Sequence, residues 1–396
     1  MKKRFSEKSF YAYKFLSECL PIYALYAILF KENGLSVTEI SLLFSIWSLV
    51  ALISELPSGI LADRWNRKYM LCIAALLRVA CYTVWSFSSG FAMFALGFFF
   101  WGIAGSFYSG TEESLVYDNL KSEGRESGFT KIYGRGRLFA SLGIVTGMVL
   151  SGILASFISI RAISVLSAGL CAISFLFACR LTEKNYYSER IKEEKVSYFS
   201  TLLEAVRLCA KNLKVLISMV FLITVIGIWA YLDEYDALII DDFGQAYIWI
   251  SVIFTVRYLF IALGNHLAPA VERKISAKSK TFIFTVAASL FLLAFSLVWN
   301  RYAIPLLGIY GMIMNIAELT QKNMIQGEIS EEGRATVMSL YGIGQNIAMI
   351  AFSLIYAFLS GVFSLKTVYA IIAVYCIAGT IVLYLISLAA RKGANP

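Results

Sequence analysis

Ionisable side chains interrupt a long apolar stretch near the start of the chain. Lys14 and Glu18 lie four residues apart there, and Tyr11 and Tyr26 follow the same helical spacing. On a continuous helix over residues 9–31 these side chains would form one stripe. A charge in the middle of a membrane costs about 3 kcal/mol or more, so it usually faces a cavity or a partner. The alternative is a Lys14–Glu18 pair that only neutralises itself.

Two further apolar stretches carry glutamates. Glu112 and Glu113 are adjacent near the end of residues 91–119, and Glu318 lies near the end of residues 302–326. Neighbouring residues point about 100° apart on a helix, so one of the adjacent acids can face a cavity and the other a neighbouring helix. We expect Glu113 to share a face with Ser106 and to correspond to Glu318.

A third acidic group closes the stretch over residues 213–240. Asp233 and Glu234 lie near its far end, where they can line an outer vestibule or belong to a solvated rim. Arg257, in the next apolar stretch, is a candidate counter-ion for these acids. Arg78 is a further buried cation, for which the sequence indicates no partner.

The composition describes the environment in which these residues lie. Hydrophobic residues make up 59% of the 396 residues and charged residues 15%, against about 25% charged in a soluble domain. The mean hydropathy is +0.71. Apolar stretches long enough to span a membrane cover residues 9–31, 37–60, 69–88, 91–119, 129–157, 161–181, 213–240, 245–270, 280–299, 302–326, 334–360 and 365–390. The sequence therefore predicts an all-α membrane protein with twelve transmembrane helices.

The polar segments between these stretches indicate the topology. Of the 35 Lys and Arg residues, 28 lie at the termini or in and next to alternate loops. Positive residues concentrate on the cytoplasmic side of a membrane, so we expect both termini to be cytoplasmic. We expect an N-terminal six-helix bundle (1–181), a cytoplasmic linker with an amphipathic helix (182–212) and a C-terminal six-helix bundle (213–396).

The loop after the second stretch carries the most specific motif. It reads Gly59-Ile60-Leu61-Ala62-Asp63-Arg64-Trp65-Asn66-Arg67-Lys68. It resembles the signature loop of the major facilitator superfamily, in which Gly is usual at the place of Asn66. Asn tolerates a left-handed backbone better than most residues. We therefore expect the loop to keep its shape, with Gly59 at a close helix approach and Asp63 near a helix N-terminus.

The resemblance implies an architecture and a gate. It implies the major facilitator fold, with two pseudosymmetric six-helix bundles that work by alternating access. It also implies an inner gate that contains Gly59, Asp63, Arg64, Arg67 and Asp118.

Further motifs are similar to a bacterial branch of drug and metabolite:proton antiporters. They are the run Glu55-Leu56-Pro57-Ser58-Gly59, Asp118 itself, and Gly333-Arg334-Ala335-Thr336-Val337. Two antiporter features differ here: Phe98 stands where such proteins carry an intramembrane Arg, and the Gly143, Gly147 and Gly152 run lacks a Pro.

The function predicted from these features is proton-coupled export of a cationic or zwitterionic amphiphile by a monomer in a bacterial plasma membrane. We expect Glu113 or Glu18 to carry the proton. The alternatives are proton-coupled import of a nutrient or metabolite, and a polytopic membrane enzyme or sensor. The expected partners are a small-molecule substrate, protons and lipid, without nucleic acid. We expect no cofactor, because nucleotide-binding loops are missing from the sequence, and no metal site, because His266 is the only histidine.

Overall fold

The computed structural model describes residues 5–183, 206–207, 209, 212–244, 246–274, 277–329 and 331–393. All regular structure within these ranges is helical. Twelve of the described helical segments are long and apolar enough to cross a membrane. They span residues 7–32, 37–55, 67–87, 91–122, 126–155, 160–180, 213–242, 247–271, 281–298, 301–327, 340–362 and 365–390. The prediction of twelve spans is confirmed.

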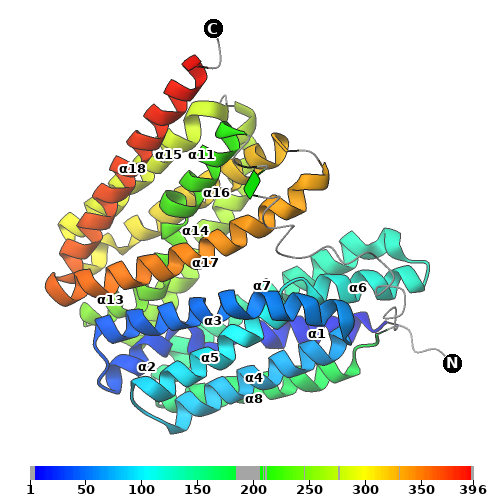
Figure 1. The fold of residues 1–396 in the computed structure, drawn as a ribbon. Coiled ribbons are helices and arrows are strands. Elements are labelled where there is room, and N and C mark those ends of the chain that lie inside the picture. Colours follow the sequence, from blue (N-terminus) through cyan, green and yellow to red (C-terminus); the bar gives the residue numbers. More distant parts are fainter. Residues whose placement is uncertain are drawn as a thin grey trace. The chain divides into compact units, whose positions relative to one another are not determined.

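Internal contacts divide the chain into two compact units, each with its own helices (Figure 1). The N-terminal unit comprises Met1–Lys195 with Gln245–Val252, and the C-terminal unit comprises Val196–Gly244 with Ile253–Pro396. The predicted linker at 182–212 falls mostly outside the described residues, so its amphipathic helix stays a prediction.

The N-terminal unit is built from long helices that run side by side (Figure 1). Helix α4 packs against α5 and α8, α3 packs against α5, and α1 packs against α7 and α8. The helices are α1 (Glu7–Glu18), η1 (Pro21–Ala24), α2 (Tyr26–Glu32), α3 (Val37–Arg64), α4 (Arg67–Phe87), α5 (Phe91–Tyr108), α6 (Thr111–Ser122), α7 (Phe129–Ala155) and α8 (Ile160–Arg180).

The first span is not a continuous helix. Helix α1 ends at Glu18, and Pro21 opens the short 3₁₀ turn η1 before α2 begins at Tyr26. Proline has no backbone N–H to bond to the carbonyl four residues earlier, and its ring crowds that carbonyl. The carbonyl of Ser17 is therefore available to another donor, and the predicted stripe from Tyr11 to Tyr26 is wrong.

The fourth span is also interrupted. Helix α5 is capped at Ser109, and α6 begins at Thr111 after Gly110 adopts a φ of 69°. This left-handed conformation costs glycine little, because glycine has no Cβ. The break changes the direction in which the adjacent acids Glu112 and Glu113 point.

The C-terminal unit contains a third interrupted span. Helix α11 continues into a π-helical turn, η3, in which the Gly227 N–H donates to the Leu222 carbonyl at 2.9 Å. Single π turns inside helices occur often at functional sites. The helices are α11 (Leu213–Phe221), η3 (Leu222–Ile226), α12 (Ile228–Leu232), η4 (Asp233–Tyr235), α13 (Asp236–Asp242), α14 (Tyr247–Lys274), α15 (Ala277–Val298), α16 (Ile304–Gly327), α17 (Glu331–Val362) and α18 (Leu365–Gly393).

Glycines of α7 bring the fifth span close to the break in the first. A Cβ on Gly143 would lie near the carbonyl oxygen of Phe15, and one on Gly147 would lie 2.7 Å from the backbone nitrogen of Leu20. Small residues permit such close approach of helix backbones. The glycine run noted in the sequence therefore lets the α7 backbone pack closely against the end of α1.

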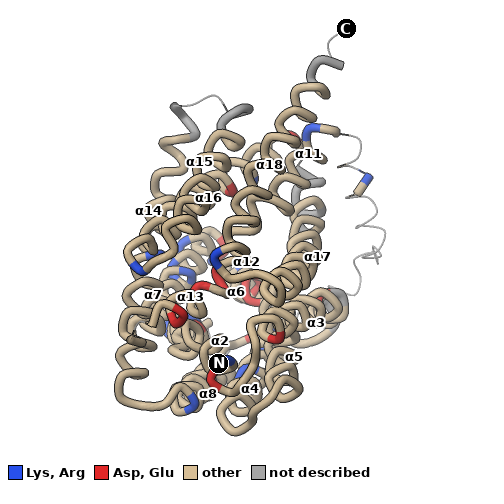
Figure 2. Tube along the Cα trace, turned by 90° about the vertical axis from the view of Figure 1, so that its left-hand side faces the viewer, with Lys and Arg blue, Asp and Glu red and all other residues tan. Residues whose placement is uncertain are grey.

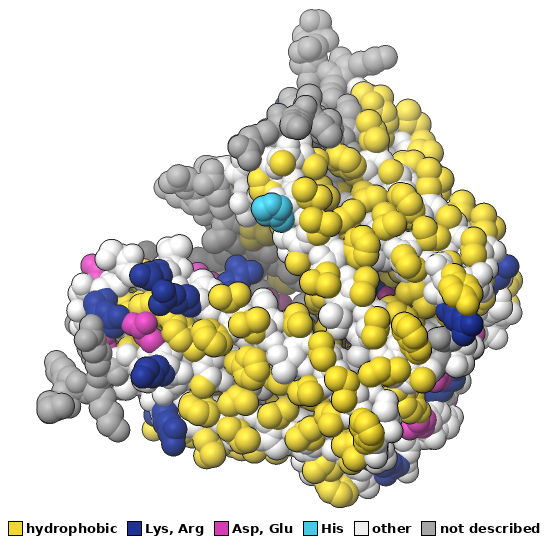
Figure 3. Space-filling model, turned by 180° about the vertical axis from the view of Figure 1, so that it is seen from behind, with side chains coloured by type: hydrophobic (Ala, Val, Ile, Leu, Met, Phe, Trp, Pro, Cys, Tyr) yellow, Lys and Arg dark blue, Asp and Glu magenta, His cyan; other side chains and the backbone are white. Residues whose placement is uncertain are grey.

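Apolar side chains cover much of the outer surface. On α7, Leu138, Leu142, Val145, Val149 and Ile153 are all exposed and recur at intervals of three or four residues. Figure 3 shows hydrophobic side chains over most of one face, with Lys and Arg gathered towards its edges. A surface of this kind is stable in lipid, where helices satisfy their own backbone hydrogen bonds.

We predict that Gly143→Ala lowers the thermal stability of the purified protein, because its new methyl group would force the α1 and α7 backbones apart. Overpacking of this kind costs about 1–3 kcal/mol. Gly134→Ala is the matched control on the same helix, since a Cβ there would meet no atom within 4 Å. Equal melting temperatures for the two variants would contradict the packing described.

Candidate functional site

A buried ion pair joins the first and fourth spans. The Lys14 Nζ atom lies 2.6 Å from Glu112 Oε2, and the two side chains are 12% and 9% exposed. Lys14 lies on α1 and Glu112 in the first turn of α6, just after the break in the fourth span. The alternative of a Lys14–Glu18 pair within one helix is therefore not what the structure shows.

Glu113 does not share this environment. Its side chain is exposed, whereas Ser106, with which it was expected to share a face, is buried. The prediction assumed a continuous helix, and the break at Gly110 removes that relation. Of these two adjacent acids, Glu112 is therefore the one that contacts the first span.

Arg78 reaches the end of helix α1 from α4. Its Nη1 atom donates to the Ser17 carbonyl at 2.6 Å and lies 3.8 Å from Glu18 Oε1. Its guanidinium also lies 4.6 Å from the centre of the Tyr108 ring. Arg78 thus donates to the Ser17 carbonyl, which has no helical donor because Pro21 lacks an N–H. The partners of Arg78 could not be identified from the sequence.

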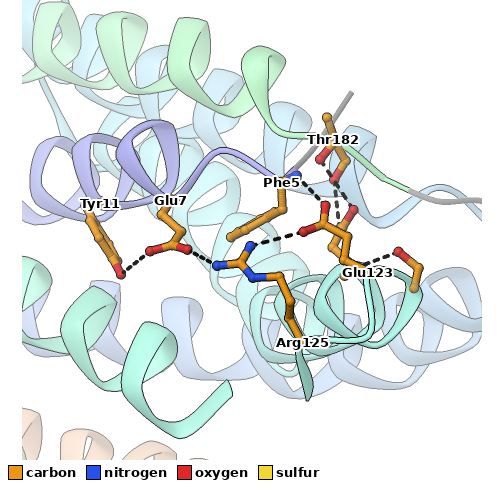
Figure 4. Close-up of polar contacts among 8 residues, drawn as sticks. Phe5, Glu7, Tyr11, Glu123, Arg125 and Thr182 are labelled. Atoms are coloured by element: carbon orange, nitrogen blue, oxygen red, sulfur yellow. Dashed lines mark hydrogen bonds and ion pairs between the residues drawn. The ribbon is translucent and has the colours of Figure 1, made fainter. Parts of the chain in front are cut away.

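Tyr11 belongs to a different cluster (Figure 4). Its hydroxyl donates to Glu7 at 3.4 Å, and Arg125 contacts both Glu7 at 2.5 Å and Glu123 at 3.1 Å. Glu123 also accepts from the backbone N–H of Phe5 at 2.6 Å. This network attaches the start of the first span to the loop after the fourth.

Tyr26 lies in an aromatic core. It is 3% exposed, and its ring contacts Trp85, Phe98 and Trp101 at centroid distances of 5.7–6.0 Å. Phe98, at the place where antiporters of the resembling branch carry an Arg, is 1% exposed and stacks on Trp101. These rings pack against one another, so they stabilise the helices of this unit.

The C-terminal unit contains an acidic site that resembles the Lys14–Glu112 pair. Glu318 Oε1 accepts from Lys322 at 2.6 Å and from the Tyr341 hydroxyl at 3.3 Å, and its Oε2 accepts from the Trp229 indole N–H at 2.9 Å. Trp229 lies on the first span of its unit and Glu318 on the fourth. Glu318, like Glu112, thus contacts the first span of its unit, although its cation Lys322 lies on its own helix. The correspondence of Glu113 with Glu318 stays a prediction.

Arg257 meets the acids of the seventh span. Its Nη1 atom lies 3.0 Å from Asp233 Oδ1 and also contacts Asp236 Oδ2, and its Nη2 donates to the Trp229 carbonyl at 3.4 Å. Asp236 and Arg257 are each 4% exposed. The alternative of a solvated outer rim does not hold for these residues. Glu234 is partly buried beside them.

The signature loop forms a junction at the start of α4. Arg67 Nη1 contacts Asp118 Oδ2 at 2.6 Å, which brings two of the predicted gate residues together. Asn66 has a φ of −73°, and its side chain accepts from the Tyr69 N–H as the N-cap of α4. Asn66 therefore caps the helix in an extended conformation, so its tolerance of a left-handed backbone is not needed here.

Glu183 completes this junction and was missed in the sequence. Its two carboxylate oxygens accept from the backbone N–H groups of Arg67 at 2.9 Å and Lys68 at 2.8 Å. Glu183 thus accepts from the N-terminus of α4, whereas the backbone of Asp63 belongs to the last turn of α3. The contact expected of the Asp63 side chain stays a prediction. The side chains of Asp63, Arg64 and Arg334 are outside the described part of the structure.

Gly59 shows no close packing. A Cβ there would meet no atom of the described chain within 4 Å. The close helix approach predicted for this glycine is therefore not observed. Among the described residues no group of three or more His, Cys, Asp or Glu side chains is placed to hold a metal ion.

The charges of the candidate site form two groups in each unit, and Figure 2 marks the acidic and basic residues along the Cα trace. In the N-terminal unit Lys14 contacts Glu112, and Arg78 lies near Glu18. In the C-terminal unit Lys322 contacts Glu318, while Arg257 contacts two acids. These contacts combine interrupted helices with buried charges, an arrangement typical of membrane carriers.

The sequence matches the family described as Major Facilitator Superfamily over residues 14–329. The chain belongs to this superfamily. It is a secondary transporter and a multi-pass membrane protein, and not an enzyme. No curated protein sequence matches it.

Solved structures of two kinds of transporter are similar to this one. A crystal structure of the nucleoside transporter NupG is 17% identical, with a TM-score of 0.80, covering 95% of this chain and 98% of that one. The POT family transporter PepTSo is 12% identical, with a TM-score of 0.71, covering 98% of this chain and 99% of that one. At these identities the similarity shows the fold of two six-helix halves, and not the substrate.

We predict that Glu183→Gln lowers the melting temperature of the protein, because it removes a negative charge from the N-terminus of α4 and one of two acceptors. Charge-assisted hydrogen bonds and the helix dipole together suggest a loss of about 1–2 kcal/mol. Glu126→Gln, at an exposed position of the same unit, is the control and should have the melting temperature of the wild type. A Glu183→Gln variant as stable as the wild type would show that this junction contributes little.

Proposed function

We propose that this superfamily member is a proton-coupled transporter of a small zwitterionic molecule, with Glu112 as its proton carrier. The observation that supports this most is the buried contact between Lys14 and Glu112, which links the interrupted first and fourth spans. We assign the proton to Glu112 in place of Glu113 and Glu18, the two carriers predicted from the sequence.

The ion pair suits proton exchange for a simple electrostatic reason. Breaking a buried pair by removing one partner costs about 3–5 kcal/mol, because an uncompensated charge remains. A proton on Glu112 would release Lys14, and Lys14 would then need another anion. Protonation and substrate binding are therefore coupled through the same contact.

The balance of charge favours a zwitterion over a simple cation. In the N-terminal unit each of Glu112 and Glu18 has a cation nearby, Lys14 and Arg78 respectively. A substrate that separates the Lys14–Glu112 pair can offer an ammonium group to Glu112 and an anionic group to Lys14. Glu112 and Glu18 are thus matched by two cations, which does not favour a substrate that carries only positive charge.

Export is the direction that the resemblance to antiporters favours, and import is the alternative. The similar structures include a nucleoside transporter and a POT family transporter, so nucleosides and short peptides belong in any substrate screen. The distribution of Lys and Arg supports cytoplasmic termini in a bacterial plasma membrane, and we propose a monomer.

The test uses purified protein in liposomes with an imposed pH gradient and a panel of zwitterionic amphiphiles, cationic amphiphiles, nucleosides and dipeptides. We expect substrate-specific proton movement in the wild type, reported by a pH-sensitive dye. In Glu112→Gln proton movement should fall to background, while exchange of labelled for unlabelled substrate continues, because a neutral Glu112 still permits the conformational change. Gradients of either sign distinguish export from import.

Glu113→Gln is the matched control, since Glu113 is the exposed neighbour on the same helix. It should keep both proton movement and exchange. Full dependence of Glu112→Gln transport on the pH gradient would refute the assignment of Glu112.

A further inference from the structure

Two carboxylates of the seventh span share one guanidinium. Asp233 is in the 3₁₀ turn η4 and Asp236 begins α13, one helical turn further along. Both contact the same atom, Nη1 of Arg257 on α14. Arg257 is the one cation in ion-pair contact with these two carboxylates among the described residues.

The three groups are largely buried. Arg257 and Asp236 are each 4% exposed, and the Asp233 side chain is 15% exposed. Two ionised carboxylates and one guanidinium leave a surplus negative charge, which is costly in an environment of low dielectric. The contacts of Lys14 with Glu112 and of Arg78 with Glu18, in contrast, each match one acid with one cation.

Polar atoms around this group lack partners. The Arg257 Nε atom and the hydroxyls of Tyr310 and Tyr369 are buried and have no hydrogen-bond partner among the described residues. Buried polar atoms in native proteins nearly always have a partner, so each such atom needs an explanation. The titratable and charged groups that surround the pair or interact with it electrostatically are Glu234, Tyr235, Tyr258, Tyr310, Tyr356 and Tyr369.

We propose that Asp233 and Asp236 form a second proton-binding site, which holds one proton between two carboxylates beside Arg257. A carboxyl pair that cannot ionise fully in one environment shares a proton in this way. The bound proton cancels the surplus charge and leaves one carboxylate for the guanidinium. A role of this site in coupling rests on the proposed function. The bound proton itself can be detected without transport.

The bound proton has a consequence for stability. If the folded chain holds a proton that the unfolded chain has released, the folded state binds more protons. Its stability then falls as the pH rises through the range in which the pair ionises. Replacement of one acid leaves a balanced pair with Arg257 and removes this dependence.

The experiment compares melting temperatures of purified full-length variants from about pH 6 to about pH 9. We expect the wild type to lose stability over this range, and Asp236→Asn to change less and to melt above the wild type at the alkaline end. Asp233→Asn is a second variant with the same expectation, should Asp236→Asn fail to fold. Asp242→Asn, at the exposed end of α13, should keep the wild-type slope.

Infrared spectroscopy gives the direct readout. The wild type at neutral pH should show a protonated carboxyl band that shifts in D2O, and that is lost in Asp233→Asn or Asp236→Asn but kept in Glu112→Gln. Absence of such a band in the wild type, or wild-type pH slopes in both aspartate variants, would overturn the second site. If an aspartate variant loses the band but keeps wild-type proton movement in liposomes, Asp233 and Asp236 bind a proton that takes no part in transport. The coupling assigned to Glu112 would then be independent of this second site.

Discussion

A charge inside the apolar part of a membrane protein requires a partner of opposite charge or a hydrogen-bonding group. In the described structure, ion pairs and hydrogen bonds of this kind connect the interrupted spans to their neighbours. In each unit an arginine from a neighbouring helix reaches an interrupted first span, where it contacts both a backbone carbonyl and a carboxylate. Arg78 does so at Ser17 and Glu18, and Arg257 at Trp229 and Asp233. A broken helix leaves backbone groups without their usual partners, so the same arginine stabilises the break and the charge.

These breaks connect the fold to transport. Pro21 and Gly110 interrupt the two spans whose side chains form the Lys14–Glu112 pair, and the glycines of α7 let its backbone approach the break in the first span closely. A carrier that works by alternating access needs contacts that can open without unfolding the helices. An ion pair between two short helical segments meets this need, because its opening moves side chains and leaves the long helices intact.

The number and order of the spans could be predicted from the sequence, because about 20 apolar residues in a row suit a membrane helix and nothing else of that length. The partners of the charges could not be. The stripe from Tyr11 to Tyr26 and the shared face of Ser106 and Glu113 both assumed continuous helices, and a single proline or left-handed glycine changes the direction of every later side chain. Glu183 was missed because its partners are backbone N–H groups of a helix distant in sequence, for which the sequence has no signal.

The most direct test of this account is a double-mutant cycle on Lys14→Met and Glu112→Gln, followed by both melting temperature and proton-driven transport. Each single variant should lose stability, because it leaves a buried polar or charged group without its partner, and the double variant should recover most of that loss. The double variant should nevertheless show no proton-driven transport. Additive losses of stability, or a double variant that still couples transport to the pH gradient, would contradict the claim that this pair links the first and fourth spans and carries the proton.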